Sequence, residues 1–224
     1  MAKIKLRQFN VLTIFPSVID AYASASILGR AQKKGVIKIV AHDLRQWTTD
    51  KHGKVDDTPY GGGPGMVMKV EPFDKATKTI RAKGGKKVRV ILTSASGKMF
   101  TQKDAKRLVK YDQLIFLCGR YEGVDARVEE HIADESFSIG PYVLTGGELP
   151  ALTMLDAIAR HVPGVLGKKE SLKEESHSTD GELEYPQYTK PEVYKRWPVP
   201  PVLLSGDHKK IAEWRKAQSK KTSP

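Results

Sequence analysis

Three glycine-rich segments supply the residues best suited to build a ligand site in this sequence. They are Tyr60–Met66, Cys118–Gly123 and Ser138–Glu148, and the second and third each follow a short apolar run. Glycine accepts positive φ angles and lets the backbone approach a ligand closely, at an entropic cost. Three such segments on one chain predict a ligand that is held by main-chain groups rather than by side-chain charge.

Two common nucleotide-binding patterns are absent from these segments. No stretch has the phosphate-binding form G-x-x-x-x-G-K-[ST]. The dinucleotide form G-x-G-x-x-G fails because its third glycine position falls on methionine, whether counted from Gly61 or from Gly63. The sequence therefore gives little support to nucleotide hydrolysis or nicotinamide chemistry, while a purely structural turn at Gly61–Gly65 stays open.

The elements that must position these segments alternate between strands and helices. Strands are predicted at Gln8–Phe15, Val36–Ala41, Val88–Thr93, Leu114–Cys118 and Ser136–Ile139. Helices are predicted at Ser17–Gly29, Glu71–Arg81, Gln102–Lys110, Val124–Ala133 and Glu148–His161. This alternation is typical of βαβ units and predicts an α/β fold with a mostly parallel sheet.

Three loops follow strands of this predicted sheet, at Thr93–Lys98, Gly119–Gly123 and Gly140–Gly147. Ligands of open parallel sheets bind beyond the carboxyl ends of the strands, so we expect these loops to share one site. Their main chain is suited to an adenine edge and a ribose, with the side chains of Tyr121, Tyr142 and Leu144 packing on the ring. Ordinary βα turns are the alternative.

The composition changes after Val165. The polar stretch Gly167–Glu184 is predicted to be a linker that is mobile when the protein is free. A small tail follows, in which Asp207 is expected to cap a helix at His208–Gln218.

The protein is strongly basic, with a formal net charge of +12 and an isoelectric point near 9.6. A charge of this size is informative about the kind of partner that the protein binds. Lys78–Arg89 holds six basic residues and no acid, and Lys103, Lys106, Arg107 and Lys110 are expected on one face of a helix. A solvated surface would explain either patch alone. Together they favour a polyanion, RNA or DNA, over a membrane.

Other features narrow the class of protein. No apolar stretch approaches the ~18 residues that span a membrane, and Met1–Lys5 lacks the apolar core of a signal peptide. One cysteine, Cys118, excludes an intramolecular disulfide framework and a cysteine-built zinc site. We therefore expect a cytoplasmic protein with no metal site of its own and no membrane partner.

Seven blocks along the chain resemble, in order, the bacterial tRNA (guanine-N1)-methyltransferases, which belong to the knotted SPOUT-type superfamily. The blocks are Tyr60–Met66, Cys118–Asp125, Ser138–Gly140, Gly146–Pro150, Pro163–Gly167, Tyr188–Pro191 and Pro200–Gly206. The resemblance implies a deep C-terminal trefoil knot, an exception to the rule that chains do not knot. It also implies a homodimer with the active site between subunits. The implied domains are a knotted α/β methyltransferase domain at 1–166, a flexible linker at 167–187 and a small helical tRNA-binding domain at 188–224.

The implied reaction moves a methyl group from S-adenosylmethionine to N1 of the guanine directly 3′ of the tRNA anticodon, position 37. By resemblance, the methyl donor lies among Leu92, Thr93, Ser94, Gly119, Tyr121, Glu122, Ser138, Ile139, Gly140, Tyr142, Leu144, Gly146 and Gly147. The loop placed near the target base is made of Gly61, Gly62, Gly63, Pro64 and Gly65. The cations placed near tRNA phosphates are Lys190, Lys195, Arg196, Lys209, Lys210 and Arg215. Participation of Mg²⁺ is left open.

Guanine N1 carries a proton, so methylation needs a base near N1 and positive charge near O6. The resemblance assigns Arg160 as the cation and Glu175 as the base, with Asp180 as the alternative base. The family usually has aspartate at the position of Glu175. We expect the linker that holds Glu175 to become ordered when donor and tRNA are both bound.

Two further positions depart from the family pattern. The loop Thr93–Lys98 lacks the usual proline and glutamine, and Pro141 stands where an aspartate is usual. Two alternatives follow: a knotted methyltransferase acting on another RNA site, such as a ribose hydroxyl, and an RNA-binding relative that has lost activity.

Overall fold

The computed structural model describes residues 7–167, 176 and 182–221. The chain divides into two compact units, Met1–Gly167 and Lys168–Pro224. Most of the linker predicted at 167–187 falls outside the described residues, and so do Glu175 and Asp180.

The first unit is built on a five-stranded sheet in which all neighbouring strands are parallel. The order across the sheet is β2 (Ile37–Asp43), β1 (Arg7–Thr13), β6 (Gln113–Cys118), β5 (Val88–Met99) and β7 (Glu135–Ser138). In register, Phe9 lies between Ile39 and Leu114. The predicted α/β class, the parallel sheet and all five strands are confirmed.

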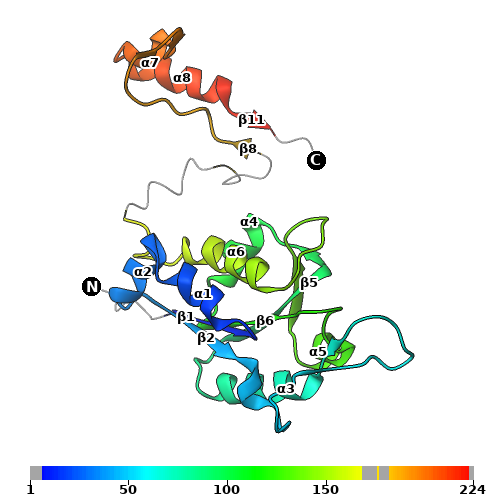
Figure 1. Ribbon diagram of the computed structural model, residues 1–224. Coiled ribbons are helices and arrows are strands. Elements are labelled where there is room, and N and C mark those ends of the chain that lie inside the picture. The colour runs from blue at the N-terminus through cyan, green and yellow to red at the C-terminus, as the bar shows by residue number, and fades with distance from the viewer. Residues whose placement is uncertain (1–6, 168–175, 177–181, 222–224) are drawn as a thin grey trace. The chain divides into compact units, whose positions relative to one another are not determined.

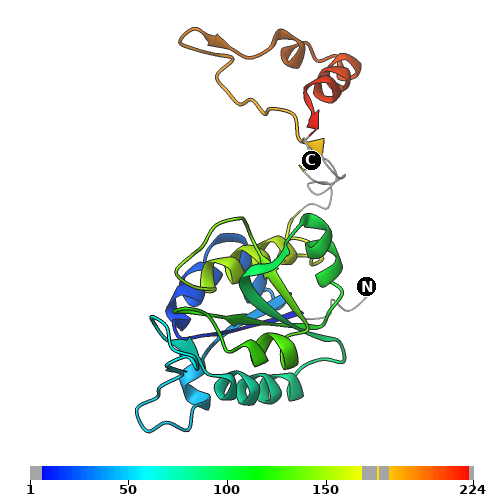
Figure 2. The ribbon, with the colours of Figure 1, turned by 90° about the vertical axis from the view of Figure 1, so that its right-hand side faces the viewer.

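Helices cover both faces of the sheet, which gives three layers (Figures 1 and 2). One face carries α1 (Pro16–Ala23), α2 (Ser26–Lys33), α4 (Gln102–Leu108) and α6 (Glu148–Ala159). The other carries α3 (Val70–Ala82), α5 (Ala126–His131) and the 3₁₀ helix η1 (Leu44–Trp47). A small antiparallel pair, β3 (Asp56–Asp57) and β4 (Val67–Met68), flanks the glycine-rich loop at 61–65.

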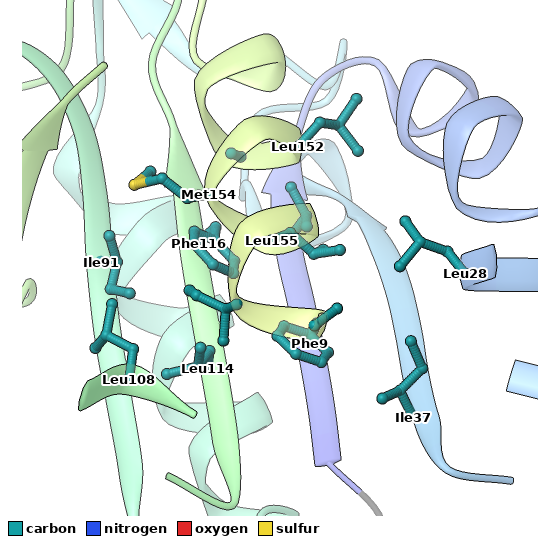
Figure 3. Close-up of a cluster of buried hydrophobic side chains, with 14 of the residues drawn as sticks. Phe9, Leu28, Ile37, Ile91, Leu108, Leu114, Phe116, Leu152, Met154 and Leu155 are labelled. Carbon is teal, nitrogen blue, oxygen red and sulfur yellow. The ribbon is translucent and has the colours of Figure 1, made fainter. Parts of the chain in front are cut away.

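Strand β6 explains why the sheet is covered on both sides. All six of its residues are buried. Leu114 and Phe116 belong to the core beneath α6, and Ile115 and Leu117 belong to the core above α3, as the period of two in a strand requires. Figure 3 shows Leu155 of α6 near Phe9 and Phe116, with Leu152 farther along the same helix; all four belong to this core. Each such side chain contributes about 1.5–3 kcal/mol by its burial.

The single helix predicted at Ser17–Gly29 is wrong, because the chain forms α1 and α2 with a break at Ser24 and Ala25. The Ser24 hydroxyl donates a hydrogen bond to the carbonyl oxygen of Ala21, 3.1 Å away. Serine side chains that bond local backbone in this way compete with helix propagation. Ser26 has a φ of 44°, in the left-handed region, and this turns the chain into α2.

The second unit is assembled from short elements. A hairpin joins β9 (Val193–Tyr194) to β10 (Trp197–Pro198), and α7 (Pro201–Leu204) and α8 (His208–Gln218) follow. Strand β8 (Glu182–Leu183) pairs with β11 (Lys220–Lys221). The Asp207 carboxylate accepts hydrogen bonds from the backbone N–H groups of Lys209 and Lys210, which confirms the predicted cap of α8. None of the side chains described in this unit is buried.

Candidate functional site

A cavity of about 470 Å³ opens at the carboxyl ends of β6 and β7 and beside residues 92–96 of β5. Its walls include the loops that follow β6 and β7 and the segment of β5 that leaves the sheet, with Ser94, Arg120 and Tyr142 among the lining residues. Every residue that the sequence placed at the methyl donor lines this cavity, namely Leu92, Thr93, Ser94, Gly119, Tyr121, Glu122, Ser138, Ile139, Gly140, Tyr142, Leu144, Gly146 and Gly147. The three loops therefore meet at one site, as expected for a parallel sheet.

The first loop is an excursion within β5 rather than the end of a strand. Both Thr93 and Lys98 pair with Phe137 of β7, so the intervening residues leave the sheet and enter the cavity wall. A Cβ atom at Gly97 would lie 2.6 Å from the backbone nitrogen of Phe137. Glycine is therefore required where the chain returns to the sheet, and β5 continues to Met99 beyond the predicted end at Thr93.

Gly147 is the point at which the three loops come together. Its N–H donates to the carbonyl oxygen of Gly119 at 2.9 Å. A Cβ atom here would lie 2.0 Å from Thr93 Oγ1 and 2.8 Å from Cys118 Cα. Only glycine allows backbone from the third loop to approach the other two this closely.

The rim of the cavity carries aromatic and apolar side chains. Tyr121 and Tyr142 are about half exposed, and Leu144 is also exposed. Tyr142 packs its ring against Gly140, where a Cβ atom would lie 2.1 Å from the ring. Tyr121, Tyr142 and Leu144 all line the cavity, and their contact with a ligand ring stays a prediction.

Arg120 lines the cavity and forms an ion pair with Glu148, which is buried behind the wall. Glu148 is only 2% exposed and accepts hydrogen bonds from Thr13 Oγ1 at 2.7 Å and from Arg120 Nε at 3.1 Å. The Arg120 guanidinium also stacks on Phe15, 4.6 Å from the ring centroid. The sequence prediction did not include Arg120 or Glu148 in the site. Their position as charged residues within glycine-rich segments was the sequence signal that could have identified them.

Burial raises the pKa of the Cys118 thiol well above its ordinary value, and the Glu148 carboxylate adds to this effect. A thiol that stays protonated is a poor nucleophile. Cys118 is therefore a packing residue beneath the cavity.

The loop at 61–65 is exposed and lies next to the cavity without lining it. Gly61, Gly62, Gly63 and Gly65 all have positive φ angles, which explains the glycines. The N–H of Glu122 donates to the carbonyl oxygen of Met66 at 3.0 Å, and a Cβ atom at Gly65 would lie 2.5 Å from Glu122 Oε1. These contacts fix the end of the loop, after Pro64, against the cavity wall.

The predicted catalytic cation, Arg160, does not lie at the cavity of its own chain. Arg160 follows the last residue of α6, whereas the cavity lies at the beginning of that helix. A helix rises 1.5 Å per residue, so Arg160 is about 18 Å along the axis from Glu148. The candidate bases Glu175 and Asp180 lie outside the described residues, and Pro141 is exposed and does not line the cavity.

Several cations of the predicted basic patches are engaged with acids. In the run 78–89, Lys78 pairs with Asp74, Arg81 with Asp134 and Arg89 with Glu135. The expected four-residue basic face at Gln102–Lys110 is corrected too. Its cations are Lys103, Lys106, Arg107 and Lys110, but Arg107 bonds Glu135 and Asp104, and Lys110 lies beyond the end of α4.

The described part of the chain has neither a metal-binding cluster nor a membrane-spanning helix. Within residues 7–167, 176 and 182–221, no cluster of three or more histidine, cysteine or acidic side chains is suited to hold a metal ion. No helix in the same ranges is long and apolar enough to cross a bilayer.

Comparison with known proteins matches nearly the whole chain to one family. The family model described as tRNA (Guanine-1)-methyltransferase TrmD matches residues 7–223. A tRNA (guanine-N(1)-)-methyltransferase of Chloroflexus aurantiacus is 51% identical over 211 residues, 94% of this chain and 83% of the relative. Relatives of the same name from Thermomicrobium roseum and Ruminiclostridium cellulolyticum are each 50% identical, over 93% and 95% of this chain and 77% and 91% of their own lengths.

Proposed function

The chain belongs to the tRNA (guanine-1)-methyltransferase TrmD family, and from this premise we propose that it transfers a methyl group from S-adenosylmethionine to N1 of the guanine directly 3′ of the tRNA anticodon. The observation that carries the proposal is the cavity formed by the loops after β6 and β7 and by the segment of β5 that leaves the sheet. It gathers, in one place, the residues that the resemblance assigns to the donor.

The residues present fit such a donor. The cavity volume of about 470 Å³ lies in the range of small-molecule sites. Main-chain groups of Gly119, Gly140 and Gly146 would hold the polar edges, while Tyr142 and Leu144 would cover the ring. S-adenosylmethionine supplies, when bound, a methyl group that its sulfonium has already activated.

The remaining chemistry falls to side chains of this protein. Guanine N1 is a poor nucleophile until it loses its proton, so we assign the carboxylate of Glu175 to accept that proton. The guanidinium of Arg160 would face O6, where negative charge develops as the proton leaves. The glycine-rich loop at 61–65 abuts Glu122 on the cavity wall and would hold the target base beside the donor.

A homodimer with shared active sites is part of this proposal. Arg160 sits at the opposite end of α6 from the cavity of its own chain, so in this proposal the Arg160 that serves a cavity comes from the second subunit. Phe15, Tyr22, Val143 and Leu149 are exposed apolar or aromatic residues on α1, on α6 and on the segments that precede these helices. Tyr22 also hydrogen-bonds Asp156 of α6 at 2.6 Å, which ties the two helices into one surface. Exposed apolar surface of this kind is typical of subunit interfaces.

The finer features of the fold follow the same premise. We propose a trefoil knot in the C-terminal half of the domain at 1–166 and a tRNA-binding role for the domain at 188–224. Nine basic and three acidic residues between Tyr188 and Pro224 support that role. We propose that the reaction takes place in the cytoplasm. Whether Mg²⁺ contributes is tested by the assay below.

The decisive assay incubates the protein with labelled S-adenosylmethionine and a tRNA transcript, with and without Mg²⁺, and maps the methylated position. We expect 1-methylguanine directly 3′ of the anticodon, and no product when that guanine is replaced by adenine. A product elsewhere, such as a methylated ribose, would instead favour another RNA site. Donor binding without turnover would favour the inactive relative.

The base can be tested by one pair of variants. Glu175→Gln should lower kcat by about 10²–10⁴-fold, because general base catalysis contributes on this scale. Its affinity for S-adenosylmethionine should stay unchanged in calorimetry. Asp180→Asn is the matched control and should keep wild-type kcat; the reverse pattern would transfer the role of base to Asp180.

A further inference from the structure

The β9–β10 hairpin presents two aromatic rings on one face. Tyr194 and Trp197 are directly opposite in the antiparallel register, so their side chains project to the same side. Their ring centroids are 5.7 Å apart, with the planes inclined by 45°. The two-residue turn between them consists of Lys195 and Arg196, so the rings stand beside two cations.

The turn holds one of these cations over the aromatic pair. Lys195 has a φ of 55°, in the left-handed region that costs a residue with a side chain about 1 kcal/mol or more. Its Nζ atom lies 5.5 Å from the Tyr194 ring centroid and 5.8 Å from that of Trp197. An ammonium at this place can attract an anionic group that arrives together with a flat ring.

Both aromatic residues of the hairpin are mainly exposed to solvent. Trp197 is 67% exposed and Tyr194 is 55% exposed, and the neighbouring Val193 is also exposed. By contrast, Trp214 of α8 is partly buried and packs against Tyr188, 6.3 Å away between centroids. Large exposed aromatic side chains gathered in one patch indicate a binding surface.

We propose that this hairpin, residues 193–198, is a stacking site for an unpaired nucleotide of the tRNA. The inference rests on the proposed function for the identity of the RNA. Exposed aromatic faces beside lysine and arginine are the pattern by which proteins bind single-stranded nucleic acid without reading its sequence. The basic excess of residues 188–224 suits a polyanion, and the loops of a tRNA supply bases that can leave their stack.

The test compares Trp197→Leu with Trp197→Phe in the full chain, with an unmodified tRNA transcript as the probe in fluorescence anisotropy. Stacking contributes about 1–3 kcal/mol per base, so Trp197→Leu should raise Kd by about 5-fold to 150-fold. Trp197→Phe keeps an aromatic face and should restore most of the affinity. Tyr194→Leu is the second variant and should weaken binding in the same direction, which keeps the test valid if one variant folds poorly.

Salt dependence separates stacking from charge. Trp197→Leu should leave the slope of log Kd against log salt unchanged, because no phosphate contact is lost. The double change Lys195→Gln with Arg196→Gln should reduce that slope by about one to two units. A reduced slope for Trp197→Leu itself would overturn the stacking proposal.

Other results would overturn it as well. Equal Kd values for wild type and Trp197→Leu would do so, and so would equal losses for the leucine and phenylalanine variants. A change in the sedimentation of the free protein caused by Trp197→Leu would assign the hairpin to a protein contact. The methylation assay keeps the two proposals apart. Weaker tRNA binding by Trp197→Leu in a protein that methylates nothing would leave the hairpin inference standing and remove the proposed reaction.

Discussion

Gly147 is the residue at which the donor cavity is most sensitive to one added carbon. A Cβ atom would lie 2.8 Å from Cys118 Cα and 2.9 Å from the nitrogen of Gly119, and backbone atoms cannot step aside as a flexible side chain would. We therefore predict that Gly147→Ala destabilises the first unit by about 1–3 kcal/mol, the usual result of overpacking. It should also weaken S-adenosylmethionine binding. Thermal unfolding and calorimetric titration measure the two effects.

Gly167→Ala is the matched control for that substitution. Nothing lies within 4 Å of a Cβ atom at Gly167, so this change should alter stability by less than about 1 kcal/mol and leave donor binding intact. Equal stability and donor affinity for Gly147→Ala and wild type would show that the three loops relax apart without harm to the site.

At the scale of elements, the Glu135 side chain links its own strand, β7, to strand β5 and helix α4. Its carboxylate accepts from Arg89 Nε of β5 at 2.6 Å and from Arg107 Nη1 of α4 at 3.0 Å. Burial alone would raise the pKa of Glu135, but the bonds with Arg107 and Arg89 outweigh it, so the pKa lies below its ordinary value. A carboxylate with a lowered pKa stabilises the fold above the pKa of the unfolded chain, and this stabilisation is lost as the pH falls through the folded pKa.

Glu135→Gln should therefore lower the free energy of unfolding at pH 7 by about 1.5–3 kcal/mol, the range for hydrogen bonds to charged groups. The variant should also lose stability less steeply than wild type as the pH drops below about 4.3, the ordinary pKa of glutamate. Denaturant unfolding at a series of pH values measures both. Asp74→Asn breaks only the exposed pair with Lys78 and should cost about 0.3–0.5 kcal/mol. An equal loss for both variants, or parallel acid profiles for Glu135→Gln and wild type, would refute the role of the carboxylate.

The elements themselves were largely predictable because their signals are local. Strand β6 is a continuous apolar run, and Asp207 is a capping residue before a helical pattern. The break between α1 and α2 was not predicted, because serine rarely adopts a left-handed φ and its presence at position 26 therefore does not indicate one. The convergence of the loops followed from a rule for parallel sheets. The buried Arg120–Glu148 pair and the contacts of Gly147 depend on tertiary neighbours, which no local pattern reports.

At the scale of the whole molecule, a net charge of +12 does not give one basic surface. In the first unit, Arg81, Arg89 and Arg107 are turned toward Asp134 and Glu135. These cations stabilise β5, α4 and β7 and are less available to an external phosphate. In the net charge of the sequence, each of these paired arginines has the same weight as Lys195 or Arg196, which lie in an exposed turn. RNA binding should therefore depend more on the second unit than the distribution of charge along the sequence suggests.

A shared active site can be tested by mixing two inactive variants. Ala95→Trp would fill the cavity of one chain from an exposed loop position, and Arg160→Ala would remove the cation. If the cation reaches the cavity of the other subunit, each mixed dimer has one intact site. Random assembly should then restore about a quarter of wild-type methylation, because half of the dimers are mixed and half of their sites are complete. Each variant alone should stay inactive, and Ala95→Trp should fail to bind S-adenosylmethionine in calorimetry. A mixture that remains inactive although mixed dimers are verified by mass spectrometry would place Arg160 and the cavity in the same chain. Wild-type activity of Arg160→Ala alone would remove Arg160 from the reaction.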